Sequence, residues 1–206
     1  MSHVAVRSPE ALTKPRKPAW DVAALLPSQG EWTEDEYLFL PTNRLVEFSD
    51  GRLEVLPVPT RLHQKIVAYL YKLLAAYVEK HGSGEVFFAA LPVRLRPGKW
   101  REPDVIFVRA ENKKALEGEF LYGADLVMEV VSNKNRNRDL ILKRREYALA
   151  GIPEYWIVDP QRQTIMVLRL KGKAYVVHGE YRKGQHALSA HLSGFEVNVE
   201  KAFDQA

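Results

Sequence analysis

In the stretch Asp125-Leu126-Val127-Met128-Glu129-Val130-Val131, the residues after Asp125 are rich in β-branched side chains and apolar, apart from Glu129. A short apolar run of this kind is typical of a strand buried on both faces of a sheet. Side chains alternate along a strand, so Glu129 shares a face with Val127 and Val131. An ionised carboxylate there is costly unless a cation, a metal or hydrogen bonds compensate it. The stretch therefore predicts a buried strand whose glutamate has a function.

Composition favours an ordinary globular protein. The chain has 206 residues, of which 46% are hydrophobic and 27% are charged, enough for one domain with a sizeable core. The net charge of +4 fits a polyanionic partner, but many enzymes share it. Cysteine is absent, which excludes disulfides, thiolate metal sites and a cysteine nucleophile, and agrees with a reducing cytosol.

The first residues differ from the rest of the chain. Residues 1–19 combine four basic residues with three prolines, which predicts a flexible basic tail before a single domain over residues 20–206. No apolar run approaches the roughly 20 residues that span a bilayer, and the N-terminus lacks the apolar region of a secretory signal. We therefore expect a cytoplasmic protein without membrane contact.

The remaining patterns predict alternating helices and strands. Thr33 and Glu36 have the spacing of a capping box, which predicts a short helix from Thr33 onward. Residues 60–81 and 137–150 are predicted as two further helices. Strands are predicted over residues 44–48, 52–56, 85–91, 93–96, 105–108, 125–131, 155–158, 164–170, 174–178 and 195–199. This order indicates an α+β domain with a mixed central sheet and helices packed against it.

Three residues suggest a site for chemistry. Asp104 follows Pro103 at the mouth of one predicted strand, Glu129 lies inside the next long strand, and Lys143 lies in the following helix. If the two strands are neighbours, both carboxylates meet at one end of the sheet. Carboxylate oxygens, a backbone carbonyl and water suit Mg²⁺, which polarises a phosphoryl oxygen, while a lysine offsets developing charge. The set therefore favours phosphodiester hydrolysis.

Each of these residues also has a purely structural interpretation. Asp104 is compatible with a simple strand entry after proline. Glu129 is compatible with a buried ion pair to Arg94 or Arg138. Lys143 is compatible with a solvated helix position.

Other candidates are weaker. His63 and Gln64, at the start of the long helix, are within reach of the site, but a surface or capping role is the simpler expectation. The six histidines show no HxxxH spacing, and GxGxxG, P-loop and GxSxG motifs are absent. A nucleotide-cofactor enzyme and a serine hydrolase therefore lack support.

Several segments together resemble a known family. They are Arg101-Glu102-Pro103-Asp104-Val105, Met128-Glu129-Val130-Val131-Ser132, Arg138-Asp139-Leu140 with Lys143 and Tyr147, residues 150–160, Leu45-Val46-Glu47-Phe48 with Asp50-Gly51, and the helix beginning at His63-Gln64. In this combination the chain resembles the Uma-two family of restriction-endonuclease-like proteins, within the PD-(D/E)XK nuclease superfamily. The resemblance runs from about residue 31 to the C-terminus. It implies an α+β (α/β) restriction-endonuclease-like core, with a mixed central β-sheet flanked by helices.

The resemblance implies metal ligands and a displaced lysine. Asp104 matches the aspartate of the PD motif and Glu129 the second acidic residue, and the carbonyl of Val130 adds a third ligand. The superfamily places a lysine two residues after that glutamate, where this chain has Val131. Members of this family take the lysine from the following helix, which corresponds to Lys143.

The resemblance also brings three further residues near the site: Glu47, as an additional acidic contributor, Gln64 and Ser132. The implied activity is a Mg²⁺-dependent endonuclease that cuts DNA, with Mn²⁺ as a substitute ion. A homodimer is expected, because two strands are cut most simply by two sites related by a two-fold axis. The alternative is a catalytically inactive nucleic-acid-binding or assembly module on the same fold. Nothing in the sequence separates DNA from RNA or branched DNA as the substrate.

Overall fold

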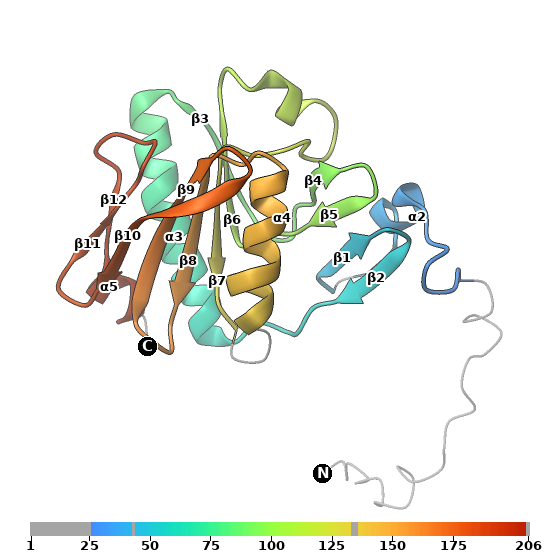
Figure 1. Cartoon of the computed structure of the whole chain (residues 1–206), viewed down its shortest axis with the longest axis horizontal. Coiled ribbons are helices and arrows are strands. Elements are labelled where there is room, and N and C mark those ends of the chain that lie inside the picture. The colour runs from blue at the N-terminus through green and yellow to red at the C-terminus, as the bar shows by residue number, and fades with distance from the viewer. Residues whose placement is uncertain (1–25, 43, 133–135, 205–206) are drawn as a thin grey trace, which may run out of the picture.

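The computed structural model describes residues 26–42, 44–132 and 136–204. The basic tail expected over residues 1–19 lies outside this part of the chain. A six-stranded sheet forms the centre, with the long helix α3 (Arg61–His81) on one face and α4 (Arg144–Leu149) on the other (Figure 1). A smaller sheet lies beside it. In the described ranges, no helix is long and apolar enough to cross a membrane.

The central sheet is mixed, as expected from the sequence. Its strand order is β10-β9-β8-β7-β6-β3. Strands β7 and β8 run parallel, and the other neighbours run antiparallel. The bounds are β3 Gly84–Phe88, β6 Val105–Arg109, β7 Leu126–Val130, β8 Glu154–Asp159, β9 Thr164–Lys171 and β10 Ala174–Arg182.

The two faces of β7 are covered by different helices. Every residue of β7 is buried. Leu126, Met128 and Val130 belong to the core that contains the apolar stripe of α3, whereas Val127 belongs to the core that contains Tyr147 of α4. Glu129 therefore points to the α4 face, as the alternation of the strand predicts.

Helix α3 has well-defined ends. The side chain of Thr60 accepts a hydrogen bond from the backbone N–H of His63 at 3.2 Å, which caps the first turn. Gly82 ends the helix in the left-handed conformation, with φ 58°. The buried stripe consists of Ile66, Val67, Leu70, Leu74 and Val78.

The second helix differs from the single α-helix expected over residues 137–150. Its first part, η3 (Arg138–Lys143), is a π-helix, and only the second part, α4, is α-helical. A π turn is rare and often marks a functional site.

The smaller sheet has the strand order β2-β1-β5-β4. Its strands are β1 Val46–Ser49, β2 Arg52–Val55, β4 Val93–Arg96 and β5 Lys99–Arg101, and helix α2 (Glu34–Leu38) belongs to the same unit. Strand β5 is not predicted from the sequence, because it is only three residues long. Its Trp100 pairs with Phe48 of β1 and joins a core with Trp32, Tyr37 and Val46.

The C-terminal part adds a two-stranded sheet and a short helix. Strands β11 (His186–Leu188) and β12 (Glu196–Asn198) pair, and helix α5 (Val199–Phe203) follows. The strand expected over residues 195–199 ends early, because Asn198 accepts a hydrogen bond from the backbone of Lys201 and caps α5. A 3₁₀ turn, η2 (Lys113–Leu116), connects β6 and β7.

Candidate active site

Asp104 and Glu129 lie side by side at one end of the neighbouring strands β6 and β7 in the central sheet. Strands β6 and β7 are antiparallel neighbours, with Val105 opposite Met128, so the next pair along the ladder is Asp104 and Glu129. Asp104 is 8% exposed and Glu129 is 4% exposed. The Oδ2 atom of Asp104 accepts a hydrogen bond from the backbone N–H of Val130 at 2.7 Å, which fixes the aspartate against β7.

The side chain of His63 reaches the same end of the two strands from the first turn of α3. Its Nε2 atom lies 3.2 Å from Asp104 Oδ2. The expected surface or capping role is therefore wrong for the side chain, since only the backbone N–H takes part in the cap. The sequence contained a signal for this contact. His63 precedes Ile66 and Val67 by three and four residues, so it continues the apolar stripe that faces the sheet.

Lys143 approaches the carboxylates from the opposite face. Its ammonium lies 2.7 Å from Glu129 Oε1, 3.2 Å from Glu47 Oε1 and 3.8 Å from Asp139 Oδ1. The residue is only 3% exposed, so the solvated position considered from the sequence is wrong.

The two arginines considered as partners of Glu129 are bound elsewhere. Arg94 pairs with Glu34 at 2.9 Å, and Arg138 pairs with Glu47 and Glu54. The cation that lies next to Glu129 is therefore Lys143.

The π turn explains how one helix presents three side chains to the site. In an α-helix, residues four apart are offset by about 40° around the axis. A π turn contains more residues, so a four-residue step falls short of a full turn instead of passing it. The rotation about the helix axis from Asp139 to Lys143, in the π turn, and the rotation from Lys143 to Tyr147, in the α-helix, therefore have opposite signs and partly cancel. All three side chains are consequently buried and face the sheet.

The donors around the two carboxylates leave one oxygen of each available. Tyr147 donates its hydroxyl proton to Glu129 Oε1 at 2.5 Å, and Lys143 donates to the same atom. Asp104 is oriented through Oδ2 alone. Among the described residues, no hydrogen-bond donor contacts Asp104 Oδ1 or Glu129 Oε2. The site thus holds two oriented carboxylates, each with an oxygen to offer to a cation.

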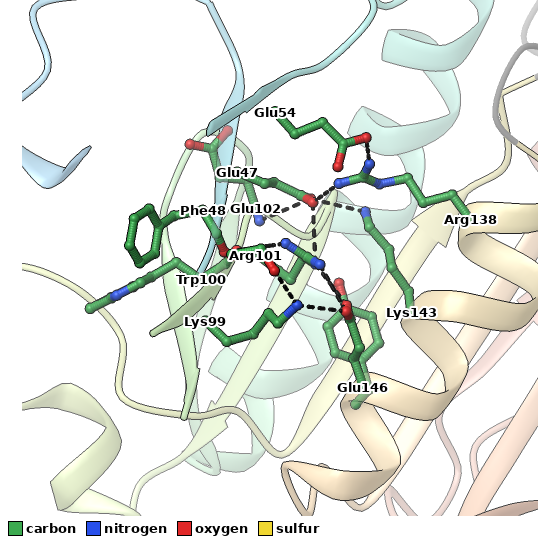
Figure 2. Close-up of polar contacts among 12 residues, drawn as sticks. Glu47, Phe48, Glu54, Lys99, Trp100, Arg101, Glu102, Arg138, Lys143 and Glu146 are labelled. Atoms are coloured by element: carbon green, nitrogen blue, oxygen red, sulfur yellow. Dashed lines mark hydrogen bonds and ion pairs between the residues drawn. The ribbon is translucent and has the colours of Figure 1, made fainter. Parts of the chain in front are cut away.

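Glu47 belongs to the same cluster, although it comes from the smaller sheet. It is fully buried at 0% exposure and contacts three cations: Lys143, Arg101 at 3.3 Å, and Arg138. Figure 2 shows this carboxylate between the three, with Lys143 and Arg138 reaching it from the helix. Glu47 is therefore engaged by cations of the protein itself.

The other residues expected near the site occupy its margins. Gln64 is exposed on α3, and Ser132 is half-buried after β7. Within the described ranges, neither side chain has a hydrogen bond to the carboxylate cluster. Val130 contributes its N–H to Asp104, and a ligand role for its carbonyl stays a prediction.

Burial and neighbouring charges set the protonation of the cluster. Burial raises the pKa of Glu129 to about 8, although the ammonium of Lys143 opposes this shift. Burial would lower the pKa of Lys143, but Glu129 and Glu47 outweigh it and raise that pKa. Burial would raise the pKa of Glu47, but Lys143, Arg101 and Arg138 hold it below its ordinary value. Lys143 is therefore a cation at neutral pH and not a base.

The side chains of Asp104 and Glu129 suit a Mg²⁺ site better than a structural zinc site. Among residues 26–42, 44–132 and 136–204, no group of three or more His, Asp and Glu side chains is arranged to hold a metal ion. A site closed entirely by protein side chains, as structural zinc requires, is therefore not formed by these residues. Mg²⁺ is commonly held by one or two carboxylates together with water and substrate phosphates. The pair Asp104 and Glu129 fits that pattern.

The mixed central sheet with helices on both faces agrees with the restriction-endonuclease-like core that the sequence predicts. The chain belongs to the Uma2 family, described as "Putative restriction endonuclease", whose family model matches residues 34–200. A solved structure with a similar fold is that of a protein from Anabaena variabilis, described as a putative nuclease belonging to DUF820. The two chains superpose with a TM-score of 0.70 at 19% identity, covering 84% of this chain and 98% of the other. Comparison with curated proteins found no match.

Proposed function

We propose that this protein is a divalent-metal-dependent endonuclease that hydrolyses DNA phosphodiester bonds, with Mg²⁺ as its ion and Mn²⁺ as a substitute. The observation that carries the proposal is the position of Asp104 beside Glu129 at one end of strands β6 and β7, with the ammonium of Lys143 2.7 Å from Glu129. In this proposal Asp104, Glu129 and the carbonyl of Val130 hold the ion.

Each group of the chain has a separate task in the proposed reaction. When bound, a divalent cation polarises a phosphoryl oxygen and acidifies water. Asp104 is held by the N–H of Val130 and by His63, so its free oxygen has a fixed direction. Lys143 remains protonated and offsets the negative charge that develops on the phosphate during attack.

Two further parts of the proposal concern the assembly. We propose a homodimer, because cutting both strands of a duplex favours two sites related by two-fold symmetry. We also propose a cytoplasmic location, consistent with the absence of cysteine from the sequence. Sedimentation equilibrium tests the dimer: a mass of one chain at micromolar concentration, with and without DNA, would contradict it.

A second candidate function is a catalytically inactive nucleic-acid-binding or assembly module. One observation favours it. Lys143 and Tyr147 both donate to Glu129 Oε1, so the buried carboxylate is already compensated without a metal. The superfamily's lysine position is also occupied by Val131.

Metal binding separates these two functions. We expect calorimetry to detect millimolar or tighter binding of Mg²⁺ or Mn²⁺ that Glu129→Gln abolishes. The matched control is Glu154→Gln. Glu154 is also a fully buried carboxylate, but it lies at the other end of β8, where it accepts hydrogen bonds from Trp156 and His191. A wild-type protein that binds neither ion, even with DNA present, would favour the inactive module.

A further inference from the structure

Arg138, the first residue of the π turn, contacts two glutamates, one of them buried and the other exposed. One end of its guanidinium contacts Glu47 of β1, and the other end contacts Glu54 of β2. Figure 2 shows Arg138 between these two carboxylates, next to Lys143. The side chain of Arg138 is 10% exposed, that of Glu47 is 0% exposed and that of Glu54 is 52% exposed. The arginine therefore lies between a buried carboxylate and a solvated one.

The two contacts of Arg138 are not equally easy to break. Glu47 is also held by Lys143 and Arg101, and removing Arg138 from it would leave a buried carboxylate with fewer partners. Glu54 is half in water, where an exposed ion pair contributes little net stabilisation. Glu54 can therefore leave the guanidinium while Glu47 keeps it in place.

Arg138 also has unused hydrogen-bonding capacity. Its Nε atom is buried and has no hydrogen-bond partner in the described part of the chain. A guanidinium binds phosphate through several N–H groups at once, and phosphate carries more acceptors than a carboxylate. The position of Arg138 also matters, because it shares Glu47 with Lys143.

From this arrangement we propose that Arg138 binds a backbone phosphate of the nucleic-acid substrate, and that Glu54 occupies the place of that phosphate in the free protein. The inference rests on the proposed function and extends it to the recognition of the substrate. Glu47 acts as the anchor that keeps the guanidinium directed at the site. Glu54 acts as an internal competitor that a phosphate displaces.

A double-mutant cycle tests this exchange. The affinity for a fluorescent DNA duplex is measured by anisotropy without divalent ions, so that no cleavage occurs, for the wild type, Glu54→Gln, Arg138→Ala and the double variant. We expect Glu54→Gln to tighten binding by about five-fold, the scale of one exposed ion pair. In the Arg138→Ala background the same change should have almost no effect. Arg138→Ala alone should lower the salt dependence of binding by about one ion.

Two further variants exclude general effects. Asp35→Asn removes the same charge from exposed helix α2 of the same unit, without a contact to Arg138, and should leave the affinity near the wild-type value. Arg138→Lys keeps a cation near Glu47 but loses the forked geometry; it should weaken binding while retaining the wild-type melting temperature to within a few degrees. This variant covers the case in which Arg138→Ala fails to fold.

The possible results separate the inference from the proposed function. Equal tightening by Glu54→Gln in both backgrounds, or none in either, would overturn the phosphate-binding role of Arg138. Binding that follows the cycle, without cleavage when Mg²⁺ is added, would support Arg138 and contradict the nuclease activity. A wild-type protein that does not bind DNA would overturn both.

Discussion

The Nζ atom of Lys143 lies 2.7 Å from Oε1 of Glu129, although Lys143 belongs to the π turn η3 and Glu129 belongs to strand β7. The sequence has Val131 two residues after Glu129, at the position where its resemblance to the nuclease superfamily predicts a lysine. The π turn instead brings a lysine from the following helix to the same carboxylate. The strand itself has no lysine, but the ammonium of Lys143 lies next to Glu129, and its role in cleavage can be tested.

We expect Lys143→Met to lower the rate of cleavage by about 100-fold or more, the scale of removing one group that stabilises developing charge. Methionine retains an unbranched chain in the buried position but removes the cation. Single-turnover cleavage of a labelled duplex measures the effect. Lys80→Met, which removes an exposed lysine near the end of α3, is the matched control and should cleave at the wild-type rate. Full activity in Lys143→Met would refute the assignment.

Tyr147→Phe removes one of the two donors to Glu129 Oε1. We expect a loss of about 1–2 kcal/mol in the free energy of unfolding, since a buried acceptor loses a partner. The affinity for Mn²⁺ should also fall, because Glu129 is less firmly oriented. Tyr155→Phe is the control: its hydroxyl donates to the backbone carbonyl of Asp139 at 2.9 Å, so it should affect stability without changing the affinity for the metal. Equal affinities in both variants would contradict the orienting role of Tyr147.

Glu146 joins helix α4 to strand β5 of the smaller sheet, and its contribution to the free energy of unfolding should depend on pH. It accepts hydrogen bonds from Arg101 at 2.8 Å and from Lys99 at 3.0 Å. Burial would raise the pKa of Glu146, but Arg101 and Lys99 outweigh burial and lower that pKa. A carboxyl with a lowered pKa in the folded state stabilises the fold above its unfolded pKa of about 4.3, and this stabilisation is lost as the pH falls through the folded value.

We therefore expect Glu146→Gln to lower the free energy of unfolding by about 3 kcal/mol at pH 7, because buried Arg101 would lose the carboxylate that accepts two of its hydrogen bonds. The difference from the wild type should shrink once the pH falls below about 4. Urea unfolding at a series of pH values measures it. A difference that stays constant from pH 7 to pH 3 would show that the ion pair does not account for the loss.

The features predicted correctly from the sequence are those that depend on neighbouring residues. The capping box of α2 is an example: Thr33 and Glu36 exchange hydrogen bonds at 3.2 Å and 2.8 Å, as their spacing predicts. The side of the sheet to which Glu129 points is another, because alternation along a strand is set by the strand itself.

The features missed from the sequence depend on partners far along the chain. Strand β5 is three residues long and exists because Trp100 pairs with Phe48 and Arg94 on either side. The π turn contacts Glu47 and Glu129 through Lys143, and the residues of the helix show no regular α-helical stripe in the sequence. Periodicity alone could therefore neither place Lys143 in the interior nor bring it to Glu129.

Cleavage of supercoiled plasmid in the presence of Mg²⁺ or Mn²⁺ tests most directly whether Asp104 and Glu129 form the active site of a nuclease. The wild type is compared with Asp104→Asn, Glu129→Gln and the control Glu154→Gln. We expect nicked and linear product from the wild type and from Glu154→Gln, and none from the other two variants or when the ion is removed with a chelator. Cleavage that survives in Glu129→Gln, or no cleavage by the wild type on plasmid, single-stranded DNA or RNA, would contradict this expectation.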